Sequence, residues 1–184
     1  MKRLMIAAAA VVALGALAGC ETATPYQPLK PGAADSGGYS ETRIEQDRWK
    51  ITFHGNSMTS RETVETYLLY RAAELTVNQG DDWFETVDRQ TDKHTSTYVD
   101  PIGPYGPGWR PYWRYYGRGF GWRGWDPYWG DPFWADNIDV QTIERYETSA
   151  EIIMHKGPKP ADDKHAFDAR DVLSNLSSKI IKPS

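Results

Sequence analysis

The chain has 184 residues, with 21 Lys and Arg side chains against 25 Asp and Glu side chains, and its formal net charge is −4 at pH 7. This length predicts one domain, or one domain with appendages. The acidic balance argues against binding to nucleic acid and against broad electrostatic binding to anionic lipid headgroups.

Residues 1–19 have the features of a secretory signal peptide. Lys2 and Arg3 form a charged start, and the apolar run "LMIAAAAVVALGALA" that follows is shorter than a membrane span of about 20 residues. The run leads into "LAGC", which ends at Cys20 and resembles the bacterial lipobox. The sequence therefore predicts removal of residues 1–19, which makes the remaining chain two charges more negative.

The lipobox resemblance implies that Cys20 carries a lipid. In lipoproteins with this motif the cysteine thiol receives a diacylglycerol and the new amine is usually acylated, and several acyl chains anchor a protein more stably than one. Cys20 is the only cysteine, so no intramolecular disulfide competes for it. The alternative is a buried cysteine in an apolar N-terminal helix.

The residue after the cysteine bears on the membrane that receives the protein. In bacterial lipoproteins that resemble this one, aspartate at this position favours retention in the inner membrane. Glu21 stands there instead. We therefore expect a lipid anchor in the outer membrane, facing the periplasm, with the inner membrane as the alternative.

The segment 20–38 is rich in proline, glycine and serine and shows no apolar period. This composition predicts a lipidated flexible tether that keeps the folded part off the bilayer. Residues 39–184 are then a single domain. It is interrupted by an irregular aromatic insertion at 101–134.

The first regular elements of the domain follow the tether. Trp49, Ile51 and Phe53 alternate with polar residues and predict a half-buried strand, preceded by a turn near 45–47. A helix is predicted next. Thr59 and Glu62 have capping-box spacing, Gly80 has the place of a C-terminal cap, and the apolar stripe between them comprises Val64, Leu68, Ala72 and Leu75.

Three further elements complete the predicted domain. A strand is expected in "DWFETVDRQT", and another contains Tyr146, Ala150, Ile152 and Met154 in one phase. A second helix follows Asp168, a plausible N-cap. The predicted fold is therefore α+β: a small two-layer sandwich of about three mostly antiparallel strands with two helices.

The insertion 101–134 contains 13 aromatic residues among its 34 positions, on a backbone rich in glycine and proline. Such rings suit a lipid–water interface, a sugar face or a protein partner. The alternatives are that the insertion covers the open sheet face or is disordered. The candidate contact residues are Trp109, Trp113, Tyr116, Trp122, Trp125, Trp129 and Trp134.

Several stretches resemble a known family. They include "TATPYQP", "GGYSETRIEQDRW", "TFHGNSMTSRETVETYLLYRAAELT", "DDWF" and "AFDARDVLSNL". Together with "LAGC" they are similar to a family of small alphaproteobacterial lipoproteins, first noted in Caulobacter, that has no assigned activity. The resemblance covers most of the chain and implies a cell-envelope lipoprotein. It carries over no catalytic residues.

We therefore expect a non-enzymatic envelope lipoprotein that binds or scaffolds through the aromatic insertion. Its partners would be the membrane, through Cys20, and an envelope protein or glycan. The alternative is a periplasmic hydrolase that uses His54 and nearby carboxylates, with Ser57 close by, but the common hydrolase motifs are missing from the sequence. The four histidines lack metal-site spacing, so we expect neither a metal nor a cofactor.

Overall fold

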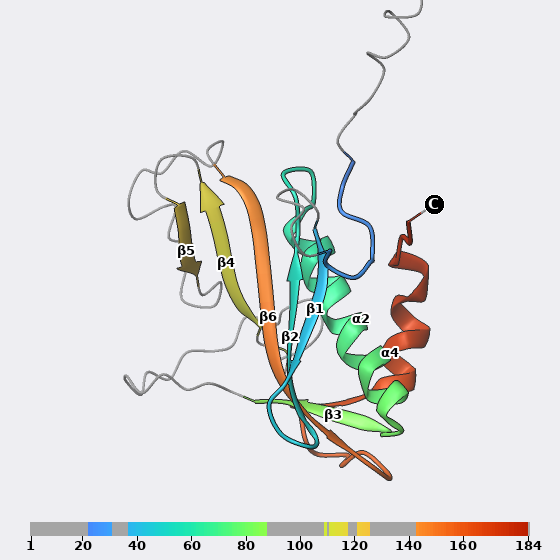
Figure 1. The fold of residues 1–184 in the computed structure, drawn as a ribbon. Coiled ribbons are helices and arrows are strands. Elements are labelled where there is room, and N and C mark those ends of the chain that lie inside the picture. The colour runs from blue at the N-terminus through green and yellow to red at the C-terminus, as the bar shows by residue number, and fades with distance from the viewer. Residues whose placement is uncertain are drawn as a thin grey trace, which may run out of the picture.

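A computed structural model describes residues 22–30, 37–87, 109, 111–117, 121–125 and 143–183 (Figure 1). Within these residues one seven-stranded sheet and two α-helices confirm the α+β class. The strands are β1 (Gly38–Arg43), β2 (Arg48–His54), β3 (Trp83–Thr86), β4 (Tyr112–Gly117), β5 (Gly121–Trp125), β6 (Ile143–His155) and β7 (Ala166–Asp168). The helices are α2 (Arg61–Gln79) and α4 (Ala169–Leu176), which the 3-10 turn η3 (Ser177–Lys179) follows. The predicted signal peptide and Cys20 lie outside the described residues.

The 13-residue strand β6 organises the sheet. One of its edges pairs with β2, and the other pairs with β4 along 143–149 and with β3 along 152–155. β1 extends the sheet from β2, β5 from β4 and β7 from β3, and all these pairings are antiparallel. The three strands predicted from the sequence correspond to β2, β3 and β6. The estimate of about three strands was therefore too low.

Helix α2 forms where the sequence predicts it, but with a different N-cap. Ser60, and not Thr59, caps the helix, because the Ser60 Oγ accepts a hydrogen bond from the Thr63 backbone N at 3.1 Å. Gly80 has a φ of 83° and takes the left-handed C-cap position that favours glycine. The predicted apolar stripe is buried throughout.

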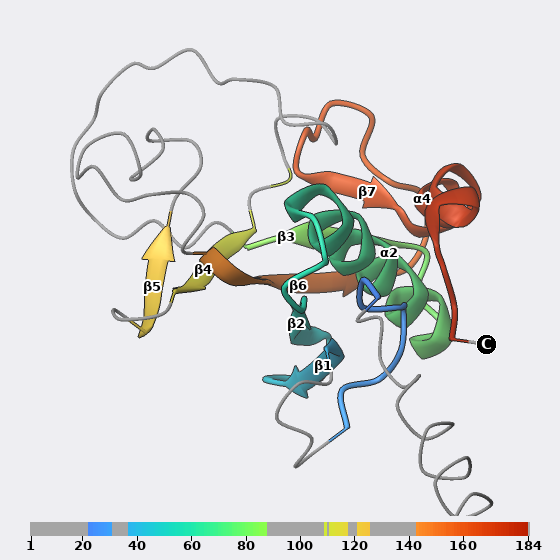
Figure 2. The ribbon, with the colours of Figure 1, turned by 90° about the horizontal axis from the view of Figure 1, so that it is seen from above.

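The core lies between the two helices and one face of the sheet (Figure 2). Ile51 and Phe53 of β2 and Ile152 of β6 turn towards the helices and are fully buried. Helix α4 packs on α2 and begins at the predicted cap, Asp168, whose Oδ1 accepts two backbone hydrogen bonds at 3.0 Å. The alternation in β2 and β6 thus decides which face of the sheet is apolar.

The aromatic insertion is regular in part, and some of its rings belong to the core. The expectation of an irregular loop is wrong for β4 and β5, which form an antiparallel hairpin joined to β6. Trp109 and Trp113 are each 1% exposed. The Trp109 ring lies edge-on to the rings of Phe84 and Phe167, at centroid distances of 6.5 and 5.8 Å. Part of the insertion therefore completes the core on the side of the helices, and the opposite face of the sheet stays exposed at Tyr112 and Trp122.

Part of the predicted tether is packed on the domain. Thr24 and Tyr26 are only 3% and 5% exposed, and Pro28 forms a parallel bridge with Tyr39. The Tyr26 ring also contacts the rings of three tyrosines that lie far away in the sequence. The prediction of a flexible tether is therefore wrong for residues 22–30, because proline-rich composition does not reveal such long-range contacts.

Candidate functional site on the polar face of the sheet

The face of the sheet turned away from α2 and α4 carries polar and aromatic side chains. Strand alternation and register place His54 of β2, Glu147 of β6 and Arg114 of β4 side by side on this face. We call it the polar face. Its side chains include Arg48, His54, Tyr112, Arg114, Tyr116, Trp122, Arg145, Glu147 and Glu151.

Glu147 links three strands of the polar face. Its Oε2 lies 2.9 Å from Nδ1 of His54, and its Oε1 lies 3.2 Å from the Arg114 guanidinium. Burial opposes ionisation of Glu147, but the hydrogen bonds and charges of His54 and Arg114 outweigh burial and lower its pKa. Glu151, which is also buried, pairs with Arg48. Both carboxylates therefore act as ion-pair partners within the sheet.

Rings and guanidinium groups alternate across β4, β5 and β6. Arg114 lies 4.9 Å from the centroid of the Trp122 ring, which lies 5.5 Å from the Tyr116 ring. Arg145 lies 6.0 Å from the Tyr116 ring on the other side. The two distances between a guanidinium group and a ring fall within the range of cation–π contacts. We call Tyr112, Arg114, Tyr116, Trp122 and Arg145 the ring ladder.

Two rings of the ladder remain exposed to solvent. Tyr112 is 59% exposed and Trp122 is 40% exposed. Tyr112 lies across Gly124 of β5, where an added Cβ would come 2.5 Å from the tyrosine hydroxyl oxygen. Gly124 therefore lets the Tyr112 ring lie over the hairpin. The two exposed rings come from adjacent strands of one hairpin and share its polar face.

The predicted contact residues fall into three groups. Trp109 and Trp113 are buried, so neither can serve as an exposed contact. Tyr116, which is half-buried, and Trp122 belong to the ring ladder and remain candidates for the predicted contact surface. The third group lies outside the described side chains and comprises Trp125, Trp129 and Trp134.

Sequence reasoning missed three members of the ring ladder: Tyr112, Arg114 and Arg145. A signal for two of them was present, because Tyr112, Arg114 and Tyr116 occupy alternate positions and therefore share one face of a strand. Arg145 lies more than 20 residues further along the chain. Its place beside Tyr116 depends on the pairing of β4 with β6, which no local pattern indicates.

The geometry around His54 does not favour the hydrolase alternative. Both oxygens of Glu147 are engaged, one by His54 and the other by Arg114. Ser57 is exposed in the turn that precedes α2, and among the described residues it makes no hydrogen bond to His54. A nucleophile activated by a base requires such contact or a close approach to it. Instead, the Nδ1 of His54 lies 2.9 Å from the Oε2 of Glu147.

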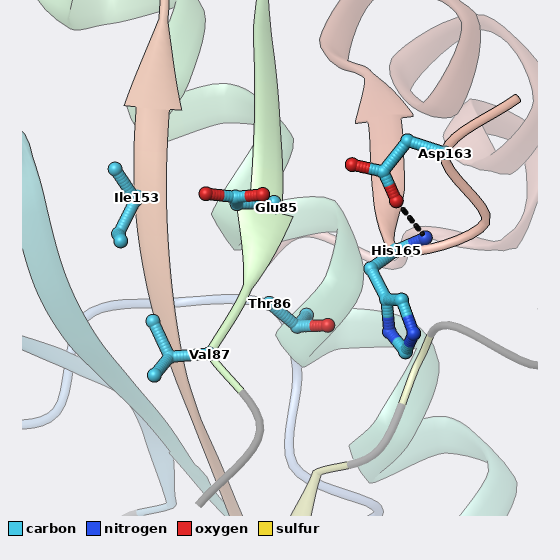
Figure 3. Close-up of a pocket in the computed structure, with 6 residues that line it drawn as sticks. All are labelled: Glu85, Thr86, Val87, Ile153, Asp163 and His165. Carbon is cyan, nitrogen blue, oxygen red and sulfur yellow. Dashed lines mark hydrogen bonds between the residues drawn. The ribbon is translucent and has the colours of Figure 1, made fainter. Parts of the chain in front are cut away.

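A cavity of about 320 Å³ lies away from the ring ladder, beside β3 (Figure 3). Its lining residues are Glu85, Thr86, Val87, Ile153, Asp163 and His165. The Asp163 Oδ1 accepts a hydrogen bond from the His165 backbone N at 2.8 Å, which stabilises the turn before β7. Neither His54 nor an exposed ring lines this cavity. It therefore supports neither the hydrolase alternative nor the ring surface.

Among the described residues, no group of three or more His, Cys, Asp or Glu side chains is placed to hold a metal ion. No helix in this part of the chain is both long enough and apolar enough to cross a membrane. Comparisons with models of protein families, with curated proteins and with solved structures give no match to the chain. Its function is therefore inferred from its own residues and their geometry.

Proposed function

We propose that the protein is a non-enzymatic lipoprotein of the bacterial cell envelope that binds an envelope polysaccharide through its ring ladder. The lipobox supports a lipid anchor at Cys20, and Glu21 favours the outer membrane with the domain in the periplasm. The resemblance to small alphaproteobacterial lipoproteins agrees with this location. The binding role depends on a different observation.

That observation is the pair of exposed rings on one hairpin. Tyr112 and Trp122 stay in water although nearby Trp113 is buried in the core, so burial does not account for them. A polysaccharide suits this surface because its sugar rings can stack on flat aromatic rings, while its hydroxyl groups can accept hydrogen bonds from Arg114, whose side chain is 41% exposed. A protein interface would need a larger apolar centre than two rings provide.

Sedimentation with purified peptidoglycan sacculi tests the proposed binding. The detergent-solubilised protein is expected to sediment with sacculi, and the double variant Tyr112→Ala/Trp122→Ala is expected to bind about tenfold more weakly, which corresponds to about 1.4 kcal/mol. Ile44→Ala is the control, because Ile44 is 44% exposed but lies at the far end of the β1–β2 hairpin.

Equal binding by the double variant and the control would contradict the proposed surface. If the unaltered protein stays in the supernatant, the glycan assignment is wrong. Capture of an envelope protein that the double variant loses would then replace the glycan by a protein partner.

A further inference from the structure

The segment 22–30 is fixed to the domain by hydrogen bonds from both backbone and side-chain atoms, and we call it the N-terminal latch. The Thr24 N donates to Thr59 Oγ1 at 2.8 Å, and Thr24 Oγ1 accepts from the Asn56 N at 3.0 Å. The Asn56 side-chain amide donates to the carbonyl oxygen of Thr22 at 2.6 Å. The start of the latch is therefore bound to the turn 55–59.

The rest of the latch is held just as closely. The Tyr26 N donates to the carbonyl oxygen of Ile181 at 2.7 Å, and Leu29 and Gln27 exchange backbone hydrogen bonds with Tyr39 at 2.7 and 2.8 Å. Gly38 has a φ of 148°, and a Cβ there would come 2.5 Å from the Gln27 carbonyl oxygen. Glycine at position 38 therefore permits the close approach of the latch.

The latch limits how far the lipid can be from the domain. Cys20 precedes Thr22 by two residues, and two residues of extended chain span at most about 7 Å. A lipidated Cys20 must therefore lie close to the turn 55–59. A tether of 18 residues would leave the domain free to turn in any direction, but this short connection does not.

The exposed apolar residues support the same orientation. Among the described residues the two most exposed large apolar side chains are Ile181, at 70%, and Met58, at 60%. Met58 lies in the turn that binds Thr22, and Ile181 bonds to Tyr26. Both side chains therefore belong to segments that hold the latch. Apolar side chains at this place can enter the boundary between headgroups and acyl chains.

We infer that the latch docks the domain on the lipid bilayer with the turn 55–59 and Met58 facing the membrane. This inference rests on the proposed lipid at Cys20. The turn 44–47 then points into the periplasm, because the seven-residue strand β2 separates the two turns by about 20 Å (Figure 1). Through β6, Tyr112 is level with Thr52 of β2 and Arg114 is level with His54, whereas Tyr116 lies beyond that level, opposite Arg145. The ring ladder therefore lies near the membrane-facing end of the polar face.

Fluorescent probes at the two ends of β2 test this orientation. The lipidated Met58→Cys and Ile44→Cys variants each carry one free thiol, since the lipid occupies Cys20. Each is labelled with an environment-sensitive NBD probe and reconstituted into vesicles of phosphatidylethanolamine and phosphatidylglycerol with a nitroxide lipid. We expect several-fold stronger quenching at position 58 than at position 44. Equal quenching at the two positions would overturn the inference.

Variants of the latch show whether it causes the orientation. Gly38→Ala in the Met58→Cys protein is expected to reduce the quenching towards that at position 44. Asn56→Asp is a milder second variant, because it keeps the side-chain acceptor used by Met58 N and Thr59 but removes the donor to Thr22. Full quenching retained in both variants would overturn the role of the latch.

The mass of the reconstituted protein distinguishes a failure of the docking from a failure of the proposed lipid anchor. A lipidated mass with equal quenching overturns the docking alone. A mass without lipid overturns the proposed function, and the docking with it.

Discussion

Replacing Trp113 with alanine is expected to lower the free energy of unfolding by about 3–5 kcal/mol. Trp113 is 1% exposed and lies edge-on to Tyr146 at a centroid distance of 6.3 Å, so its removal leaves a large cavity in the core. A small domain has only about 5–15 kcal/mol of stability, and the variant will unfold at much lower urea concentration and temperature. Chemical and thermal denaturation measure this loss.

Trp122→Ala is the matched control, because it removes the same side chain from the same hairpin at an exposed position. We expect Trp122→Ala to change the free energy of unfolding by no more than about 1 kcal/mol, including the lost contact with Arg114. Equal destabilisation by the two variants would show that the hairpin is not divided into a core side and a contact side. Replacing the whole insertion by a short turn would remove Trp109 and Trp113 together, so we do not expect a stable domain after that change.

Replacing Glu65 with glutamine is expected to stabilise the protein at pH 8 by up to about 3 kcal/mol. Glu65 is 7% exposed in α2, and burial raises its pKa to about 7, an effect that Arg61 opposes and Glu62 reinforces. Well below pH 4.5 Glu65 is protonated in both the folded and the unfolded chain, so it does not affect the free energy of unfolding there. Glutamine stays uncharged at every pH.

The pH dependence follows from this raised pKa. As the pH rises from 4.5 towards 7, the unfolded chain loses the Glu65 proton before the folded chain does, and the folded state loses stability until the pH exceeds the folded pKa. Glu147 acts in the opposite direction, because its lowered pKa contributes stability that is lost at acidic pH. Urea denaturation at the two pH values will show that the free energy of unfolding at pH 8, relative to that at pH 4.5, is higher in Glu65→Gln than in the unaltered protein.

Glu45→Gln is the control for this prediction, since Glu45 is well exposed in the turn between β1 and β2. We expect its pH dependence to match that of the unaltered protein. An unchanged pH dependence in Glu65→Gln as well would contradict the assignment of the effect to Glu65.

Local patterns predicted the elements that carry their own signals. The helix that ends at Gly80 and the helix capped by Asp168 were found from their caps and apolar periods. The strand around Ile51 was found from its alternation. These features depend on residues within one or two turns of each other, so no knowledge of distant contacts is needed.

The errors concern features that depend on distant contacts. β7 has only three residues and exists because it pairs with β3. The sequence predicts a flexible tether where the latch lies, because proline-rich composition does not show that Tyr26 packs against Tyr67 and Tyr70. Likewise, the sequence of the insertion does not show which of its rings are buried and which are exposed. Only the register of β4 on β6 decides that Trp113 is buried while Tyr112 is exposed.

The lipid at Cys20 supports both the proposed location and the orientation on the membrane, and intact mass spectrometry tests it most directly. The protein is extracted from the membranes of the cells that make it and weighed beside a Cys20→Ser variant. We predict a chain that begins at Cys20 and carries the added mass of a diacylglycerol, with this mass lost in the variant. A membrane-extracted chain that retains residues 1–19, or that begins at Cys20 with a free thiol, would contradict the account.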